Sequence, residues 1–121
     1  MPALIIYGVP ESKTGILEEL THALINTVVY SVDELKLKTS DVSVFYPKDL
    51  KTKGLGEEII IFVDCLTDKP ERTEEIRNRL AQAIVETAVK YFPDANLVEC
   101  FIRPFNPKQG FAGIRLDQPS K

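Results

Sequence analysis

The sequence predicts an α/β (α+β) fold in a single domain: a tandem βαβ repeat that builds a four-stranded mixed sheet with two helices on one face. Two observations lead to this prediction. Four short apolar runs have the length of strands and two longer segments have helical period, in the order strand, helix, strand in each half of the chain. Equivalent elements of the two halves, residues 2–50 and 57–105, are offset by about 55 residues. A C-terminal tail at 106–121 is rich in turn-forming residues.

The first half supplies a strand, a helix and a second strand. Residues 3–9 (ALIIYGV) form an apolar run that is punctuated by glycine and proline, as a buried strand would be. Ser12 is a candidate N-cap for the helix that follows. The apolar face of this helix consists of Ile16, Leu20, Ala23, Leu24, Thr27 and Val28. Residues 42–46 (VSVFY) alternate with period two and predict the second strand, before a loop over 48–56.

The second half repeats this order. Residues 58–66 (EIIIFVDCL) predict the third strand, and Thr67 or Asp68 then provides an N-cap with Pro70 at the first helical position. The helix has one apolar face, made of Ile76, Leu80, Ala83, Ile84, Thr87 and Tyr91. Residues 97–103 (LVECFIR) predict the fourth strand.

Composition and charge exclude several classes of function. The chain has 121 residues, of which 44% are apolar and 27% charged, and its net charge is −3. These values are ordinary for a soluble globular protein and do not indicate nonspecific nucleic-acid binding, which needs basic surface. No apolar run approaches the ~20 residues of a membrane span, and the N-terminus lacks the pattern of a signal peptide. We therefore expect a cytoplasmic protein with neither a nucleic-acid nor a membrane partner.

The residue types that hold metals and cofactors are scarce. Cys65 and Cys100 both lie within apolar runs, so we expect two buried thiols, with one disulfide as the alternative. His22 is the only histidine, and the ligands are too few for a zinc site. The sequence contains no nucleophile-elbow serine and no glycine-rich phosphate loop, so it predicts no cofactor.

The strands predict a second apolar face that two helices cannot cover. Ile60 and Phe62 alternate with the residues expected to face the helices, and the fourth strand alternates in the same way. A bare face with this much apolar area favours association, so we expect a closed homo-oligomer. The alternation places three charged residues on that face, and they need partners across an interface, in a pocket or among themselves; they are Glu58, Glu99 and Arg103.

The start of the chain carries the functional hypothesis. Met1-Pro2 is followed at once by a strand. If Met1 is removed, Pro2 presents a secondary amine, and the reference pKa of an α-amino group is about 7.7–8.0. Apolar burial and a nearby cation both lower this pKa, because they disfavour the charged amine. A neutral amine held by a strand could act as a general base on a carbon acid, or as a nucleophile.

The initial Met-Pro, the immediate strand, the tandem repeat, the chain length and the uncovered face together resemble the tautomerase superfamily, which has the fold of macrophage migration inhibitory factor. The likeness spans nearly the whole chain in architecture, with little motif identity, and is greatest to a bacterial branch. The resemblance implies a trimer whose sheets line a central barrel and an active site around the N-terminal proline between subunits. It also implies keto-enol tautomerisation, or isomerisation, hydration or dehalogenation of unsaturated acids.

The resemblance implies catalytic roles for two residues. Pro2 matches the catalytic proline of the family. Arg103, at the end of the last predicted strand, is the candidate cation for a substrate carboxylate, because a guanidinium contacts a carboxylate through two parallel hydrogen bonds. The alternative for Arg103 is an ion pair with Glu99 or Glu58.

Two further residues are candidates for substrate binding. Lys36 follows the first predicted helix, where the best-known member of the family has a pocket lysine; Lys38 is an equal rival, and a solvated surface is the alternative for both. Phe111 lies in a glycine-flanked segment, Gly110 to Gly113, that resembles the glycine-flanked phenylalanine of short family members. It would wall the pocket or pack as a plain turn on the neighbouring subunit.

Three functions remain open from the sequence. The first is a tautomerase or isomerase of a small unsaturated or 2-oxo acid with Pro2 as general base. The second is a non-catalytic oligomeric binding or structural protein of the same fold, with Arg103 held in an ion pair. The third is a ferredoxin-like regulatory, ligand-binding domain, which shares the order of elements but has an antiparallel sheet.

Overall fold

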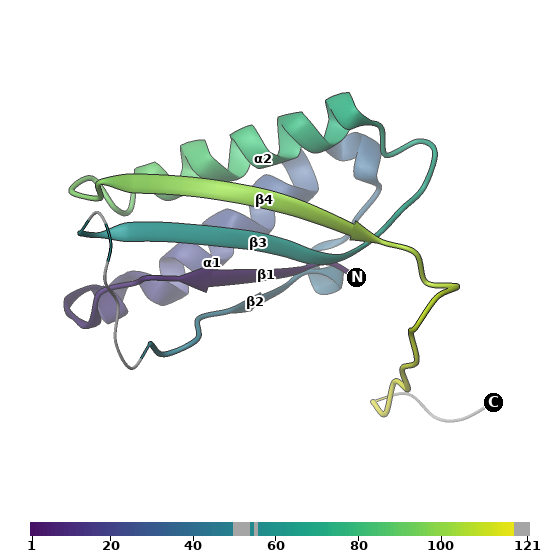
Figure 1. Cartoon of the computed structure of the whole chain (residues 1–121), viewed down its shortest axis with the longest axis horizontal. Coiled ribbons are helices and arrows are strands. Elements are labelled where there is room, and N and C mark those ends of the chain that lie inside the picture. The colour runs from purple at the N-terminus through teal and green to yellow at the C-terminus, as the bar shows by residue number, and fades with distance from the viewer. Residues whose placement is uncertain (50–53, 55, 118–121) are drawn as a thin grey trace.

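The sheet joins the two halves of the chain along one antiparallel seam. The computed structural model describes residues 1–49, 54 and 56–117. Strands β1 (Ala3–Tyr7), β2 (Ser43–Phe45), β3 (Glu58–Thr67) and β4 (Leu97–Phe105) form a sheet of order β2-β1-β3-β4 (Figure 1). β1 pairs parallel with β2 and β3 parallel with β4, whereas β1 and β3 are antiparallel. The tandem βαβ fold is confirmed. The ferredoxin-like alternative is wrong, because two of these three pairings are parallel.

Both long helices cover the same face of the sheet. Helices α1 (Leu17–Asn26) and α2 (Glu74–Val89) lie behind the strands in the view of Figure 1. A 3-10 turn over Glu11–Ile16 leads into α1, and a π-helical turn over Thr27–Ser31 extends it. Two short 3-10 turns then bring the chain back to the start of β2; they span Asp33–Leu35 and Thr39–Asp41.

The beginnings of both helices differ from the predictions. Thr73 is the N-cap of α2, and its hydroxyl accepts a hydrogen bond from the amide of Ile76 at 3.3 Å. Thr67 and Pro70 do not begin this helix, because β3 continues through Thr67 and a turn follows before Thr73. Ser12 lies inside the 3-10 turn, and α1 begins without a side-chain cap.

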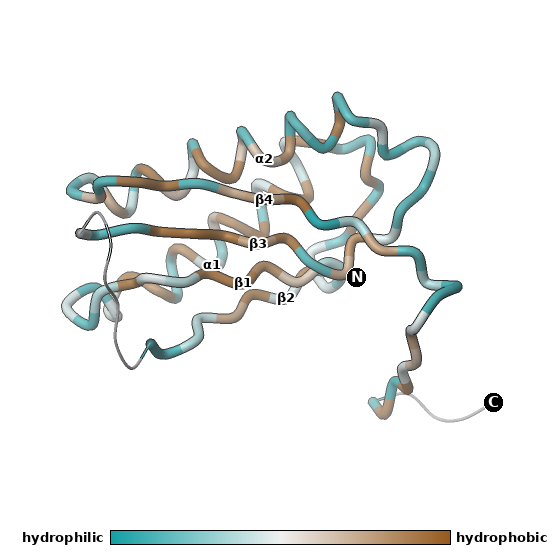
Figure 2. Tube along the Cα trace, viewed as in Figure 1, coloured by the Kyte–Doolittle hydropathy of each residue, from teal (hydrophilic) through white to brown (hydrophobic). Residues whose placement is uncertain are grey.

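The core lies between the sheet and the two helices. Figure 2 shows mostly apolar residues along β3 and apolar stretches interrupted by polar ones along β4. Alternate residues of the strands point toward the helices, and together with the inner faces of α1 and α2 they are fully buried. These residues include Leu4, Ile6, Leu20, Leu24, Ile59, Ile61, Val63, Leu80 and Ile84. Among the described residues, none of the helices combines the length and apolarity that a membrane crossing requires.

A glycine ends β1 because no larger residue fits. Gly8 has a φ of +88°, a left-handed value that side chains disfavour. A Cβ atom at this position would overlap the carbonyl oxygen of Glu58 on the neighbouring strand. The chain therefore leaves the sheet at Gly8 while staying in close contact with the first residue of β3.

A β-bulge interrupts the pairing of β3 with β4 near the C-terminal end of β3. Val63 pairs with Ile102 and Leu66 with Pro104, so Asp64 and Cys65 together oppose a single β4 residue. Cys65 adopts a left-handed φ of 64°, which shifts the alternation by one position. Leu66 consequently turns into the core, and Cys65 is exposed. The prediction of two buried thiols is wrong for Cys65, and both cysteines are free.

Candidate active site

Pro2 is fixed at one end of the sheet. It immediately precedes β1 and is buried, and its carbonyl oxygen accepts a hydrogen bond from the amide of Ser43 at 3.1 Å. On the other side, Ala3 pairs with Asp64 of β3. Backbone contacts to two neighbouring strands therefore hold the residues around Pro2. Figure 1 shows the N-terminus at this end, beside the ends of β3 and β4.

Arg103 lies at the same end of the sheet and is paired with Asp64. Its Nε donates to Oδ1 and its Nη2 to Oδ2 of Asp64, both at 2.6 Å. This pair raises the pKa of the Arg103 guanidinium above its ordinary value, mainly through the hydrogen bonds to Asp64. The side chains of Arg103 and Asp64 are 54% and 24% exposed. The predicted partners, Glu99 and Glu58, are therefore the wrong ones.

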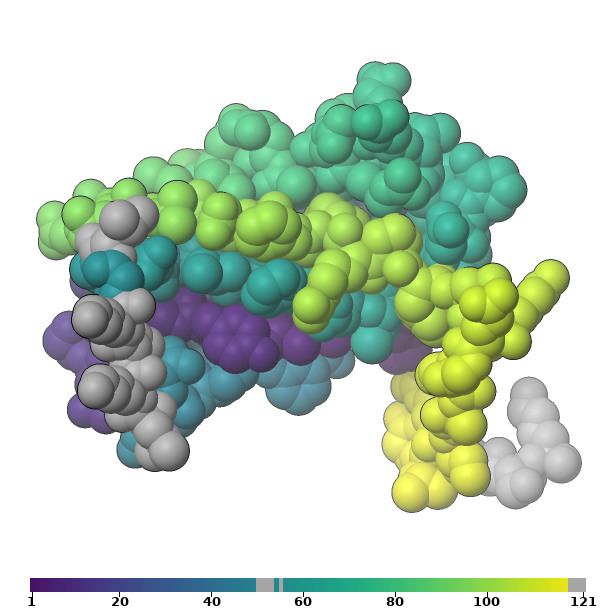
Figure 3. All heavy atoms as spheres, in the orientation of Figure 1, coloured from purple at the N-terminus to yellow at the C-terminus, as the bar shows by residue number. Residues whose placement is uncertain are grey.

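An aromatic row runs across the sheet face that the helices leave uncovered. Phe62 stacks on Phe101 with ring centroids 5.4 Å apart, and Tyr7 meets Phe62 edge-on at 6.0 Å. The guanidinium carbon of Arg103 lies 4.1 Å from the Phe62 ring centroid, so a cation–π contact ends the row. The sequence predicts Tyr7 as a core residue, because it alternates away from Pro2 along the first strand. This prediction is wrong, because Tyr7 lies on the uncovered face and is partly exposed. Figure 3 views this face of the molecule.

Lys36 is exposed on the segment between α1 and β2. It adopts a left-handed φ of 55° at the end of the short 3-10 turn, and its amide donates to the carbonyl of Asp33 at 3.0 Å. The same turn is tied to α2, because Arg79 donates from both terminal nitrogens to the carboxylate of Glu34. Lys38 is also exposed. The structure thus fixes the backbone of this segment and leaves the two lysine side chains at the surface.

Phe111 belongs to the tail, which extends away from the body of the molecule (Figures 1 and 3). Its ring meets that of Phe105 edge-on, with centroids 5.6 Å apart, and its side chain stays largely exposed. Two further apolar residues of the tail, Ile114 and Leu116, are more exposed still. Within one chain, Phe111 therefore packs on Phe105 at the end of β4.

The structure brings two of the four candidate residues to one end of the sheet without joining them. β3 lies between β1 and β4, and neighbouring strands are about 4.8 Å apart, so Pro2 and Arg103 are separated by roughly 10 Å across the sheet. Asp64 lies between them and is the residue that sequence reasoning missed. Its position on the uncovered face follows from the alternation of β3, but its pairing with Arg103 depends on the register at the bulge.

A buried arginine near this end was also missed. The side chain of Arg72 is almost fully buried and donates to two backbone carbonyls, that of Thr67 at 2.9 Å and that of Leu35 at 3.4 Å. These contacts join the end of β3 to the turn that precedes Lys36. No pattern in the sequence distinguishes Arg72 from the neighbouring charged residues of the same segment.

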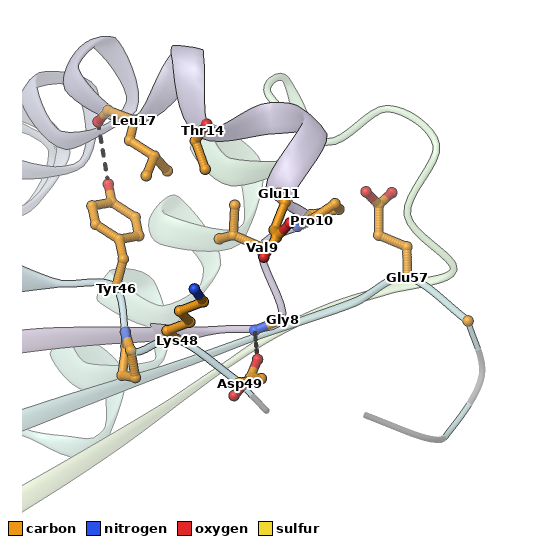
Figure 4. A pocket seen from close by; sticks show the side chains of 12 residues that line it. Gly8, Val9, Pro10, Glu11, Thr14, Leu17, Tyr46, Lys48, Asp49 and Glu57 are labelled. Carbon is orange, nitrogen blue, oxygen red and sulfur yellow. Dashed lines mark hydrogen bonds between the residues drawn. The ribbon is translucent and has the colours of Figure 1, made fainter. Parts of the chain in front are cut away.

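A cavity lies at the other end of the sheet. It has a volume of ≈770 Å³ and is lined by residues that follow β1 and β2, among them Glu11, Tyr46 and Lys48 (Figure 4). Asp49 at its edge accepts a hydrogen bond from the amide of Gly8 at 3.2 Å. The sequence groups five lysines as a solvated strand edge and loop or, alternatively, as a site for an anionic ligand; they are Lys36, Lys38, Lys48, Lys51 and Lys53. Lys51 and Lys53 fall outside the described residues. Because this cavity lies at the end of the sheet opposite Pro2, it is separate from the candidate active site.

The two cysteines differ in exposure. Burial raises the pKa of the Cys100 thiol to about 12, so Cys100 is almost entirely the neutral thiol at pH 7. Cys65 is exposed. Within the described part of the chain, no cluster of three histidine, cysteine, aspartate or glutamate side chains is suited to hold a metal ion.

The fold is shared with several solved structures. Macrophage migration inhibitory factor from Toxoplasma gondii matches with a TM-score of 0.58 and 14% identity, over 93% of this chain and 97% of that one. A wild-type fused 4-OT described as an asymmetric trimer matches with a TM-score of 0.64 and 17% identity, over 92% of each chain. A domain of unknown function (DUF1904) from Sebaldella termitidis matches with a TM-score of 0.66 and 16% identity, over 93% and 95%.

Comparisons of the sequence with protein-family models and with curated proteins find no match. The structural matches cover almost the whole of this chain and most of each matched chain. The chain therefore shares the fold of macrophage migration inhibitory factor and of fused 4-OT. At identities below 20% the likeness defines the fold, and the chemistry has to be argued from the residues of this chain.

Proposed function

We propose that this protein, once Met1 is removed, is a keto-enol tautomerase or isomerase of a small 2-oxo or unsaturated carboxylic acid. Pro2 takes a proton from the carbon next to the substrate carbonyl and returns it to another atom. Arg103 binds the substrate carboxylate or the developing enolate, and Lys36 is a second cation for that role. No cofactor takes part in this proposal.

The observation that carries the proposal is the placement of Pro2. Its burial at the head of β1, together with the hydrogen bond from Ser43, supports a rigidly held nitrogen in an apolar environment. With Met1 attached, that nitrogen is an amide and cannot accept a proton. Removal of Met1 would create a secondary amine, and apolar burial would lower its pKa toward neutrality.

The proposal includes a homotrimer. The roughly 10 Å between Pro2 and Arg103 leaves the site incomplete within one chain, and the aromatic row leaves the sheet with an uncovered apolar face. Association of copies through this face would bury the aromatic rings and bring residues of one copy to the Pro2 of another. Phe111, on the extended tail, would wall the site from a neighbouring subunit.

Turnover of phenylpyruvate by protein whose N-terminus is verified by intact-mass spectrometry tests the mechanism. A general base contributes about 10²–10⁴-fold to rate, so a Pro2→Ala variant, or a chain extended by one residue before Pro2, should lose at least that factor in kcat. Pro10→Ala is the matched control, since it removes a proline from the loop after β1. Undiminished turnover in the extended chain would rule out Pro2 as the base.

The alternative is a non-catalytic oligomeric binding or structural protein of the same fold. The Arg103–Asp64 pair favours this alternative, because Asp64 already occupies one edge of the cation that a substrate would use. It predicts that native protein retains Met1 and that no enolisable acid is turned over. Mass spectrometry of protein from its natural cell therefore separates the two functions, because only a free Pro2 permits catalysis.

A further inference from the structure

The guanidinium of Arg103 has two edges that can each hold a carboxylate, and Asp64 fills one of them. The Nε–Nη2 edge donates both of its hydrogen bonds to Asp64. The other edge consists of Nη1 and the second hydrogen of Nη2. Among the described residues, Asp64 is the only side chain that accepts a hydrogen bond from Arg103. One edge of the guanidinium therefore remains for a ligand.

Phe62 and Asp64 together orient that edge. The guanidinium carbon lies 4.1 Å from the Phe62 ring centroid, so the ring packs against one flat face of the guanidinium and restrains it. The two 2.6 Å hydrogen bonds to Asp64 restrain its rotation in the plane. Within one chain, 54% of the Arg103 side chain is exposed at the end of the aromatic row, which leaves it open to a small molecule.

Asp64 also sets the charge that a ligand meets. The positive charge of Arg103 and the negative charge of Asp64 are in direct contact, so their fields largely cancel a few ångströms away. An anion on the free edge keeps its hydrogen bonds to the guanidinium but gains little long-range attraction. A second negative charge on the ligand would meet the repulsion of Asp64 with no further cation from this pair.

We propose that Asp64 is a specificity-determining residue: it leaves Arg103 one edge and no net charge, so this subsite takes substrates with one carboxylate in preference to dicarboxylates. The inference rests on the proposed function for the identity of the substrate, but the binding preference belongs to the Arg103–Asp64 pair itself. The three residues that build the preference are Phe62, Asp64 and Arg103.

Asp64→Asn tests the inference because it removes the charge and keeps the size. The Coulomb energy is proportional to the charge of the ligand. A given fold-change in the KM of a monoanion should therefore become the square of that fold-change for a dianion. We expect the KM for phenylpyruvate to fall by about threefold and that for oxaloacetate by about tenfold, with kcat nearly unchanged. Salt should reduce both effects, since it screens the interaction.

Equilibrium binding provides a readout that does not depend on turnover. Calorimetric titration with butyrate and succinate, which have one and two carboxylates, should show a larger gain in affinity for succinate in Asp64→Asn than for butyrate. Asp64→Glu keeps the charge and should retain the preference of the native chain. Asp68→Asn is the matched control, because Asp68 is a more exposed carboxylate nearby and pairs with Arg77 at 3.8 Å.

The outcomes distinguish the two proposals. If no variant turns over any acid but Asp64→Asn gains affinity for succinate, the proposed function fails and the role of Asp64 stands. If Asp64→Asn binds succinate no better than the native chain, or gains equally for butyrate and succinate, the role of Asp64 is overturned. A loss of thermal stability with raised KM values for every acid would likewise overturn it, since that pattern indicates a structural residue.

Discussion

Cys65 has a backbone conformation that its residue type disfavours. Its φ of 64° is left-handed, which costs a residue with a Cβ atom roughly 1–2 kcal/mol. The bulge formed here turns Leu66 into the core and leaves Asp64 on the uncovered face beside Arg103. A strained residue thus connects the packing of β3 with the geometry of the Arg103–Asp64 pair.

Cys65→Gly should stabilise the protein. Glycine removes the left-handed strain but loses roughly 0.5–1 kcal/mol through the greater freedom of the unfolded chain, so we expect a net gain of about 0.5–1 kcal/mol in the free energy of unfolding. Urea denaturation measures this gain. Cys65→Ala keeps the Cβ atom and therefore most of the strain, and it should show little gain; equal stabilisation by both variants would contradict the explanation.

The alternation in β3 shows which residues could be placed from the sequence. Val63 and the residues before it lie on the faces that period-two alternation predicts, and so do Glu58, Glu99 and Arg103. The prediction failed after Asp64, because nothing in the sequence indicates that a cysteine adopts a left-handed conformation. The partner of Arg103 could not be predicted for the same reason, since it depends on the register at the bulge.

At the scale of elements, the turn before Lys36 is held against α2 by Glu34 and Arg79. The hydrogen bonds from Arg79 lower the pKa of the Glu34 carboxyl from 4.5 to about 2. Because the folded pKa is lowered, this pair stabilises the fold above about pH 4.5, and its contribution fades as the pH falls toward 2. Both side chains are well exposed, so the effect is small.

Glu34→Gln should therefore lower the melting temperature by about 1–2 °C at pH 6 and by less as the pH falls, until the variant and the native chain converge near pH 2. Differential scanning calorimetry from pH 2 to 6 measures the difference. Glu18→Gln, on the exposed side of α1, removes the same charge elsewhere and serves as the control. A melting-temperature difference that is constant with pH would argue against the pair.

The elements themselves followed from the sequence more closely than their ends did. The four strands and two helices occur where the repeat predicts them, because the spacing of apolar residues along the sequence identifies the faces that are buried. The start of α2 was predicted too early, since Thr67 and Asp68 are as capable of capping as Thr73. The choice among them is made by how far β3 continues, which depends on its pairing with β4.

For the whole molecule, the uncovered sheet face is the feature that most needs a partner. Phe101 is 45% exposed on this face although it stacks on Phe62. The tail adds exposed apolar residues that find little to contact within one chain. Both features are consistent with the proposed trimer, in which copies would cover one another's aromatic rows.

Phe101→Lys should convert the proposed trimer into monomers. The substitution adds a charge to a partly exposed position, so the chain should keep its fold while association is lost. Size-exclusion chromatography with light scattering should give three times the 13.6 kDa chain mass for the native protein and one chain mass for the variant. Tyr30→Lys, at a 70% exposed position on the helical side, should stay trimeric. A monomeric native protein would contradict the proposed assembly.

The antiparallel pairing of β1 with β3 bears on how the chain could have arisen from two copies of a shorter one. Each half of the chain makes its own parallel pair, and the halves meet only strand to strand at this seam within the sheet. An antiparallel pairing of equivalent strands is compatible with a two-fold axis. A polypeptide of half this length, paired with an identical copy of itself, would thus build the same four-stranded layer, and gene duplication with fusion would then allow the two halves to diverge.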